Sequence, residues 1–199
     1  MAVSYNGAIF ITNGVYMLQT NGRRLIVITG SVGAGKSTTS LALAQSLRRP
    51  DRAVAVIDLD QMYCFVRQQD GYGEPTAWLR ARQGAAALVD CLFNTGMSVV
   101  IVEGEFFNAE ELGTLTAPIQ SAVEHSFFTL QVSYERNLER VQGDPLRGGS
   151  KNPSFLKWLH TQFLQALPFL QEQSVVITTD GLTLDQVVAR LIAVIELAS

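Results

Sequence analysis

The chain has 199 residues, a formal net charge of −3 and a sequence pI of about 5.4, with 47% hydrophobic and 17% charged residues. This balance excludes a disordered or fibrous chain and argues against a general nucleic-acid binder, and the length suits a single domain. No run approaches the roughly 18 apolar residues of a membrane span and no signal peptide is recognisable, so we expect a cytoplasmic protein that does not bind a membrane. We also expect it to bind no nucleic acid and to be a monomer or homodimer.

The first 22 residues contain two short β-prone runs, residues 8–12 and 15–18, with Asn13-Gly14 between them. An Asn-Gly pair at this place is a strong hairpin signal. We therefore expect residues 1–22 to be an N-terminal extension. An added hairpin, an oligomer contact and a poorly ordered segment remain open alternatives for it. Residues 23–199 are expected to form the main domain.

Five short, continuously apolar runs follow, as is typical of buried parallel strands. They span residues 25–29, 53–57, 99–102, 127–132 and 175–178. Helical patterns lie between and after them, at 37–49, 78–93, 108 to about 123, 134–141, 154–172 and 184–197. Capping boxes at Asn108 and Thr183 mark two helix starts, and Pro168 is expected to kink or divide the fifth helix. The alternation predicts a three-layer α/β fold with a five-stranded parallel sheet and helices on both faces.

The two cysteines, Cys64 and Cys91, are far apart and lack a CxxC or Cys/His ligand spacing. This usage favours a reduced intracellular setting over a disulfide framework. Cys91 sits in an apolar pattern, so we expect it to be a small core residue.

The first strand leads directly into a segment that matches G-x-x-x-x-G-K-[ST] and then opens a helix. Glycines let successive backbone N–H groups point at phosphate oxygens, and the helix start adds its positive dipole end. Lys36 is expected to reach the β and γ phosphates of ATP, and the Ser37 hydroxyl to ligate Mg²⁺. The predicted nucleotide-binding residues are Gly30, Ser31, Val32, Gly33, Ala34, Gly35, Lys36, Ser37 and Thr38. The motif indicates the ligand but leaves the reaction open.

Acids follow the second and third apolar runs, at the edge where parallel strands deliver residues to a ligand. We interpret Asp60 as the base that accepts a hydroxyl proton and Asp58 as a helper of Mg²⁺; the alternative is that these acids only cap the loop or the next helix. Glu103 is expected to order the metal from the third strand. Continued strand alternation would point Glu105 the other way.

A glycine-rich stretch after the fourth strand predicts a lid at about residues 141–153. Arg140 and Arg147 flank it, and we interpret them as catalytic cations that neutralise a transferring phosphoryl group while the lid excludes water. Surface salt bridges are the alternative for each.

Three arginines, Arg67, Arg80 and Arg82, lie between the second and third strands, where an acceptor would bind. Each could grip an anionic substrate, although solvated arginines are common. Trp78 could stack on a ring, but core packing is favoured for it.

Together these segments resemble the small P-loop kinases related to shikimate kinase, gluconate kinase, chloramphenicol phosphotransferase and the zeta-toxin group, over residues 24–197. The matching segments are GSVGAGKST at 30–38, D-x-D at 58–60, EG at 103–104 and ERVQGDPLRG at 139–148. The resemblance implies a P-loop NTPase fold with sheet order 2-3-1-4-5, a D-x-D that serves the metal and the acceptor, lid arginines on ATP, and adenine contacts near 178–181. The third-strand turn of shikimate kinases and the DGxPR of nucleoside monophosphate kinases are absent, so neither substrate carries over.

The leading hypothesis is an ATP- and Mg²⁺-dependent kinase that moves the γ phosphate to a hydroxyl of a small molecule. Its predicted catalytic residues are Lys36, Asp60, Arg140 and Arg147, and its predicted metal-site residues are Ser37, Asp58 and Glu103. The alternative is an ATPase or nucleotide-dependent switch without an acceptor. A polynucleotide end kinase would need a basic groove, which the net charge of −3 does not suggest.

Overall fold

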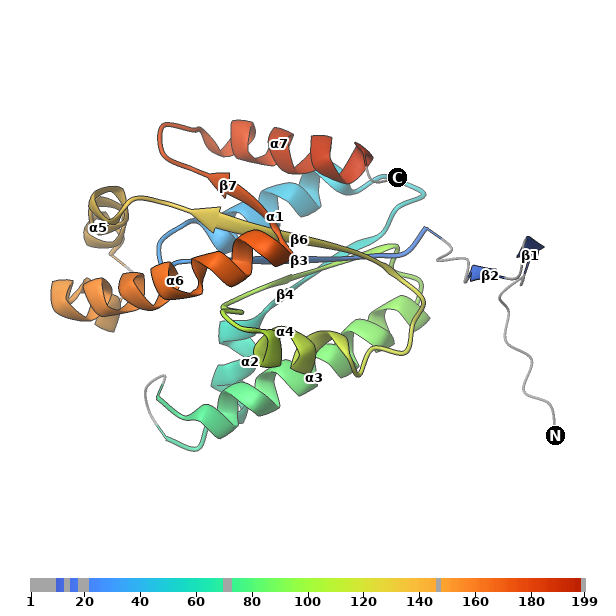
Figure 1. The fold of residues 1–199 in the computed structure, drawn as a ribbon, viewed down its shortest axis with the longest axis horizontal. Helices are drawn as coiled ribbons and strands as arrows, with labels where there is room; N and C mark the ends of the chain where they lie inside the picture. Colours follow the sequence, from blue (N-terminus) through green and yellow to red (C-terminus); the bar gives the residue numbers. More distant parts are fainter. Residues whose placement is uncertain (1–9, 13–14, 18–21, 70–72, 146–147, 198–199) are drawn as a thin grey trace.

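The computed structural model describes the chain apart from residues 1–9, 13–14, 18–21, 70–72, 146–147 and 198–199 (Figure 1). Five strands form one parallel sheet in the order β4-β5-β3-β6-β7. They are β3 (Arg24–Gly30), β4 (Val54–Asp58), β5 (Val99–Glu103), β6 (Glu124–Gln131) and β7 (Val175–Thr178). Counted along the chain, this is the predicted order 2-3-1-4-5, which is confirmed.

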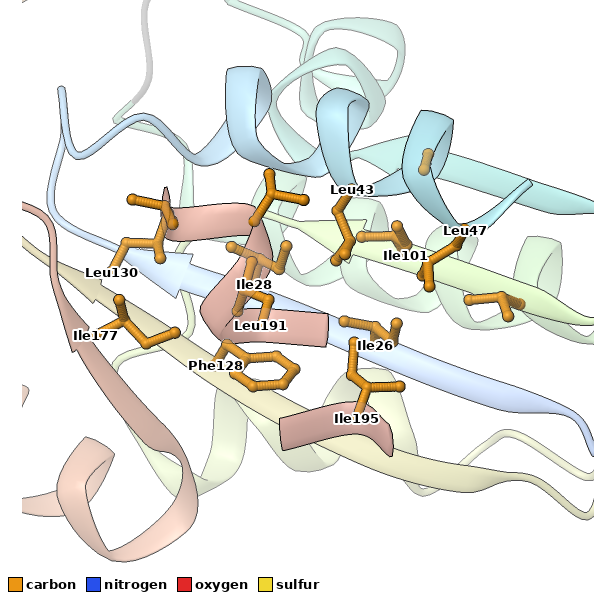
Figure 2. Close-up of a cluster of buried hydrophobic side chains, with 14 of the residues drawn as sticks. Ile26, Ile28, Leu43, Leu47, Ile101, Phe128, Leu130, Ile177, Leu191 and Ile195 are labelled. Atoms are coloured by element: carbon orange, nitrogen blue, oxygen red, sulfur yellow. The ribbon is translucent and has the colours of Figure 1, made fainter. Parts of the chain in front are cut away.

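Helices cover both faces of the sheet, so that helices, sheet and helices form the three predicted layers (Figure 1). The helices α1 (Lys36–Leu47) and α7 (Leu184–Leu197) pack on one face, where Figure 2 shows Leu43, Leu191 and Ile195 against strand residues such as Ile26 and Phe128. The helices α2 (Leu59–Val66), α3 (Pro75–Asn94) and α4 (Ala109–Thr116) enclose a second apolar cluster on the other face. Every residue of β3 is buried, because this central strand has neighbours on both edges and both faces.

The remaining elements are α5 (Tyr134–Gly143), the short 3-10 helix η1 (Gly149–Lys151) and α6 (Pro153–Gln173). Near the N-terminus β1 (Phe10–Thr12) pairs antiparallel with β2 (Val15–Met17) in a separate two-stranded sheet. The Asn13-Gly14 pair, on which the hairpin prediction rests, lies outside the described residues. Within the described residues, no helix combines the length and apolar character of a membrane-spanning segment.

The observed helices differ from the predicted ones in three respects. The helix expected to reach about residue 123 ends at Thr116. Ala117 still donates to the Gly113 carbonyl, but Pro118 has no backbone N–H with which to continue the helix. The helix α6 is not divided at Pro168. Cys91 is exposed, since the buried face of α3 passes through Val89 and Phe93 and turns position 91 outwards.

Both capping predictions are confirmed. The Asn108 side chain accepts a hydrogen bond of 2.9 Å from the Glu111 N–H at the start of α4. At α7 the Thr183 N–H donates to Gln186 over 2.9 Å and the Gln186 N–H donates to the Thr183 hydroxyl over 3.3 Å, which makes a reciprocal capping box.

Candidate functional site

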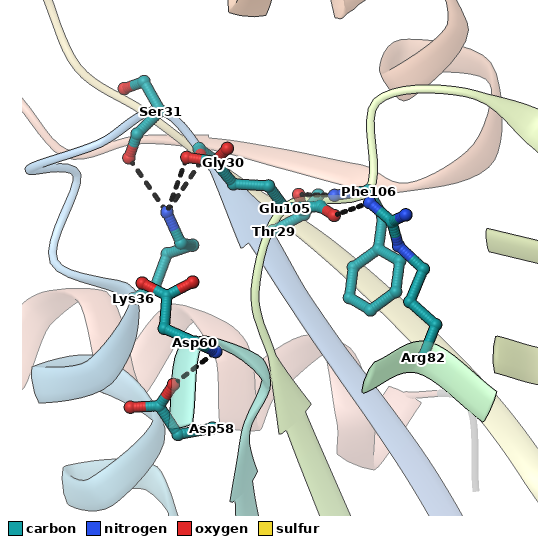
Figure 3. Close-up of polar contacts among 9 residues, drawn as sticks. All are labelled: Thr29, Gly30, Ser31, Lys36, Asp58, Asp60, Arg82, Glu105 and Phe106. Carbon is teal, nitrogen blue, oxygen red and sulfur yellow. Dashed lines mark hydrogen bonds and ion pairs between the residues drawn. The ribbon is translucent and has the colours of Figure 1, made fainter. Parts of the chain in front are cut away.

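The glycine-rich segment forms a loop between β3 and α1, as expected. Gly33 has a φ of 77°, and an added Cβ would lie 2.2 Å from Oδ1 of Asn137 in α5, so only glycine fits here. Gly35, with a φ of 93°, is the N-cap of α1. The Lys36 ammonium donates to the carbonyl of Gly30 over 3.0 Å and to that of Ser31 over 3.3 Å (Figure 3). The loop is therefore shaped as a cradle with its lysine held across it.

A pocket of about 290 Å³ opens beside this cradle. Gly33, Ala34, Gly35 and Thr38 of the loop segment line it, together with Thr39, Arg140, Val141, Asp144, Thr179, Leu182, Leu184 and Val187. Apolar side chains from the start of α7 thus face a polar wall made by the loop and α5. Thr179, from the segment expected to contact adenine, is buried at the pocket, and Arg140 lies 3.4 Å from its hydroxyl. Arg140 also approaches the carbonyls of Gly33 and Ala34 at 3.5 Å.

Asp58 and Asp60 lie at the carboxyl end of β4, where the unpredicted helix α2 begins. Oδ1 of Asp58 accepts hydrogen bonds from the backbone N–H of Asp60 at 2.8 Å and of Gln61 at 3.2 Å. Asp58 is thus the N-cap of α2, as the alternative interpretation held, and capping uses one of its two carboxylate oxygens. Asp60 is exposed in the first turn of α2.

Glu103, the last residue of β5, is only 3% exposed. Burial raises the pKa of its carboxyl to about 7, while a hydrogen bond with Ser37 and the nearby charge of Lys36 oppose the rise and the charges of Asp58 and Asp60 add to it. Glu103 is therefore brought together with the two predicted metal-site partners, Ser37 and Asp58. A hydroxyl and carboxylate oxygens are the donors that Mg²⁺ prefers.

Glu105 lies on the same side as the cradle, so the expectation that it points away was wrong. Its carboxylate is 3.9 Å from the Lys36 ammonium (Figure 3). Strand alternation no longer applies, because β5 ends at Glu103 and the chain turns at Gly104, where an added Cβ would lie 2.6 Å from that of Leu59. Burial raises the pKa of Glu105, the charges of Asp60 and Glu111 add to the rise, and Lys36 and Arg82 oppose it.

The backbone around Glu105 is fixed on three sides. The Gly104 N–H donates to the Ile28 carbonyl and the Phe106 N–H to the Thr29 hydroxyl, both over 3.1 Å. The Arg82 guanidinium donates to the Glu105 carbonyl over 3.2 Å (Figure 3). These bonds hold the residue in place on the side of Lys36.

Arg82 is buried and does not extend as a substrate-gripping arginine. Its guanidinium forms an ion pair of 3.0 Å with Glu111 and lies 5.9 Å from the ring centres of Trp78 and Phe106. Burial lowers the pKa of Arg82, and the charge of Glu111 opposes the shift. Trp78 itself stacks on Tyr63 at 4.2 Å, in agreement with core packing.

The predicted lid is only partly described. The helix α5 extends to Gly143, η1 follows at Gly149–Lys151, and Arg147, one of the two predicted lid cations, lies outside the described residues. Sequence reasoning missed Asn137, which is completely buried behind Gly33 and whose side-chain amide has no hydrogen-bond partner in the described part of the chain. Its position one helical turn before Arg140 on α5 was the only available signal.

The residues present fit a nucleotide-bound Mg²⁺ better than a metal held by protein alone. Among the described residues, no three His, Cys, Asp or Glu side chains are grouped as a metal site. Mg²⁺ commonly takes one or two protein oxygens and completes its shell with water and substrate phosphates. Ser37, Asp58 and Glu103 beside a phosphate cradle match that requirement.

The sheet order and the cradle define a P-loop nucleotide-binding domain. A family model described as the CobQ/CobB/MinD/ParA nucleotide binding domain matches residues 25–139, which is more than half of the chain. The chain belongs to this family. A comparison with curated proteins found no match.

Solved structures with the same fold include several small P-loop kinases. Shikimate kinase from Bacteroides thetaiotaomicron has a TM-score of 0.61 and 19% identity, over 86% of this chain and 98% of that one. A gluconokinase from Sinorhizobium meliloti 1021 has a TM-score of 0.60 and 14% identity, over 84% of this chain and 89% of that one. APS kinase from Mycobacterium tuberculosis has a TM-score of 0.56 and 15% identity, over 87% of this chain and 97% of that one. At these identities the similarity shows the fold, and the predicted small-kinase resemblance is confirmed at that level.

Proposed function

We propose that the protein is an ATP- and Mg²⁺-dependent kinase that transfers the γ phosphate to a hydroxyl of a small-molecule acceptor. The supporting observation is a group of acids beside the cradle. The charge of Lys36 acts on Glu103 and Glu105, and the charges of Asp58 and Asp60 act on Glu103. A hydrolase needs only a positioned water, whereas a kinase needs a group that accepts the acceptor's proton and a site that holds the acceptor.

In the proposed reaction Lys36 holds the β and γ phosphates, and Asp60 receives the proton of the attacking hydroxyl. A bond forms between the acceptor oxygen and the γ phosphorus while the bond from that phosphorus to the β–γ bridging oxygen breaks, and ADP leaves. Mg²⁺, when bound, supplies charge neutralisation on the phosphates; Ser37, Asp58 and Glu103 are the residues that would hold it. Arg140, which lines the pocket beside the cradle, would neutralise charge on the transferring phosphoryl group.

The test is ADP formation by the purified chain with Mg²⁺, alone and with a panel of small hydroxyl compounds. We expect at least one acceptor class to raise turnover, and Asp60→Asn to remove that increase, since kinetic loss of a proton acceptor amounts to about 10²–10⁴-fold. Asp51→Asn is the matched control. Asp51 is exposed in the turn before β4, at the amino end of this strand, whereas Asp60 follows its carboxyl end. Lys36→Ala should abolish turnover of every kind.

The competing hypothesis, an acceptor-independent ATPase or switch, predicts a different pattern. Hydrolysis that no acceptor stimulates, that survives Asp60→Asn and that is lost in Lys36→Ala would establish it and refute the kinase proposal.

A further inference from the structure

Asn137 is a buried polar side chain next to the cradle that the proposed reaction does not use. It is 0% exposed, and neither Oδ1 nor Nδ2 of its carboxamide has a hydrogen-bond partner among the described residues. Its backbone N–H, in contrast, donates to the Ser133 carbonyl over 2.9 Å. A carboxamide that is buried without partners is unfavourable, and an apolar side chain would fill the same place without that cost. Packing alone therefore does not explain an amide at this position.

The carboxamide of Asn137 lies against the backbone of Gly33. A Cβ added at Gly33 would lie 2.2 Å from Oδ1 and 3.3 Å from Cγ of Asn137. Because a carbon–carbon bond is about 1.5 Å long, the Gly33 Cα itself is within about 4 Å of Oδ1. The peptide groups that flank Gly33 are therefore within short reach of the amide.

Gly33 belongs to a β-turn whose central peptide can face either way. The Ala34 N–H donates to the Ser31 carbonyl over 3.1 Å, so Val32 and Gly33 are the two central residues of the turn. The φ of 77° at Gly33 is that of the third position of a type II turn. Types I and II share the Ser31–Ala34 bond and differ by a reversal of the peptide between the central residues. A neighbouring group can therefore set the direction of the peptide that joins Val32 to Gly33.

The helix α5 holds such a group firmly beside the turn. At its start the Ser133 N–H donates to Asp180 over 3.0 Å and the Ser133 hydroxyl over 2.6 Å. Further along the helix Arg140 approaches the Gly33 carbonyl at 3.5 Å, and Cγ2 of Val141 is 3.0 Å from the Cβ position of Gly33. One face of α5 thus rests on the cradle.

Phosphate binding requires one of the two directions of this peptide. The Gly33 N–H is expected to point at a phosphate oxygen, and the N–H and C=O of a planar trans peptide point in opposite directions. The Val32 carbonyl then points away from the phosphates. We propose that Asn137 is a positioning residue of the cradle: with nucleotide bound, its Nδ2 donates to the Val32 carbonyl and keeps the Gly33 N–H directed at the phosphates. The inference needs nucleotide binding only, so it applies to a kinase and to an ATPase alike.

The experiment measures the dissociation constant of a non-hydrolysable ATP analogue with Mg²⁺ by calorimetry, in Asn137→Leu and in Asn137→Ala. Leucine keeps the number of side-chain heavy atoms and alanine leaves a space, so the two variants differ in packing but lose the same bond. The dissociation constant should rise about three- to tenfold in both, whatever their midpoints of urea denaturation. Asn94→Leu is the control. Asn94 is exposed at the end of α3, next to the amino end of the sheet, and its variant should stay within about twofold of the wild type.

A packing role for Asn137 predicts another pattern. A dissociation constant that stays within about twofold of the wild type in both variants, or that rises only in the less stable one, would overturn the inference. A crystal structure of the wild type with Mg²⁺ and the analogue tests the bond without any variant. Nδ2 should lie within about 3.2 Å of the Val32 carbonyl oxygen, and a separation beyond about 3.5 Å would overturn the inference as well. ADP formation is measured separately, so a chain that binds ATP but responds to no acceptor would refute the kinase proposal and leave this assignment standing.

Discussion

Replacement of Glu103 by glutamine should stabilise the metal-free protein at alkaline pH. Glu103 is 3% exposed, and burial raises the pKa of its carboxyl from 4.5 to about 7. Between these values the folded chain keeps a proton that the unfolded chain has released. The free energy of unfolding therefore falls as the pH rises from about 4.5 to about 7, and the loss is complete above that range. At about 1.4 kcal/mol per pKa unit, the loss amounts to about 3 kcal/mol.

Glutamine has nearly the same shape as glutamate and does not ionise, so Glu103→Gln should escape this loss. Urea denaturation in EDTA should show the variant more stable than the wild type by about 3 kcal/mol at pH 8, and equal to it within about 0.5 kcal/mol near pH 4.5. Glu172→Gln, an exposed glutamate near the end of α6, is the control and should change stability by less than about 0.5 kcal/mol at both pH values. If the advantage of Glu103→Gln were absent at pH 8 or the same at both pH values, the reasoning from burial would be refuted.

The same variant also tests the metal assignment. A ligand that binds only the folded state raises its stability. The extra stabilisation that ATP with Mg²⁺ gives over ATP with EDTA should therefore be smaller in Glu103→Gln than in the wild type. If this extra stabilisation were the same in the variant and the wild type, Glu103 would not be a residue that holds the metal.

Four further substitutions test the framework around the site by urea denaturation. Gly104→Ala should destabilise by about 1–3 kcal/mol because its Cβ would lie 2.6 Å from that of Leu59; Gly113→Ala, in open space within α4, should instead be neutral or stabilise by up to about 1 kcal/mol. Thr183→Ala should cost about 1 kcal/mol, because it removes the hydroxyl that accepts from the Gln186 N–H at the start of α7, and no loss would contradict the capping assignment. Arg82→Met should cost about 2 kcal/mol, because it removes the ion-pair partner of the partly buried Glu111 carboxylate, which keeps its hydrogen bond from the Phe107 N–H; a neutral result would show that the pair is only a surface contact.

The fold could be predicted because its signals are local. Continuous apolar runs identify strands that are buried on both faces, and the glycine-rich motif between a strand and a helix fixes the site at the carboxyl edge of the sheet. The α2 helix was missed although Asp58 has the position and type of an N-cap, with Leu59 and Tyr63 spaced four residues apart on one face. Capping was the alternative interpretation of these acids, but no helix was predicted at residues 59–66.

The positions of Glu105 and Arg82 could not be predicted, because they depend on contacts between distant segments. Glu105 turns towards Lys36 only because β5 stops two residues earlier, and strand ends are the least certain part of any sequence interpretation. Arg82 lies on the buried face of α3, in line with Ala81 and Ala85, and its acidic partner Glu111 comes from α4. The arginine's place on an apolar face was visible in the sequence, but its partner was not.

The acids of the site are arranged against the stability of the metal-free fold. Asp58 and Asp60 raise the pKa of Glu103, and Asp60 raises that of Glu105, so each charge makes the next one less favourable, with Lys36 opposing the rise at both glutamates. Asp58 has a structural task as the cap of α2. Glu103 has a hydrogen bond with Ser37 and the charge of Lys36 nearby, but these do not offset the effect of burial on its pKa. A cation bound with the nucleotide near Glu103 would favour the ionised carboxylate and lower the free energy of this arrangement. The unfavourable burial of Glu103 in the metal-free fold therefore supports the proposed Mg²⁺ site.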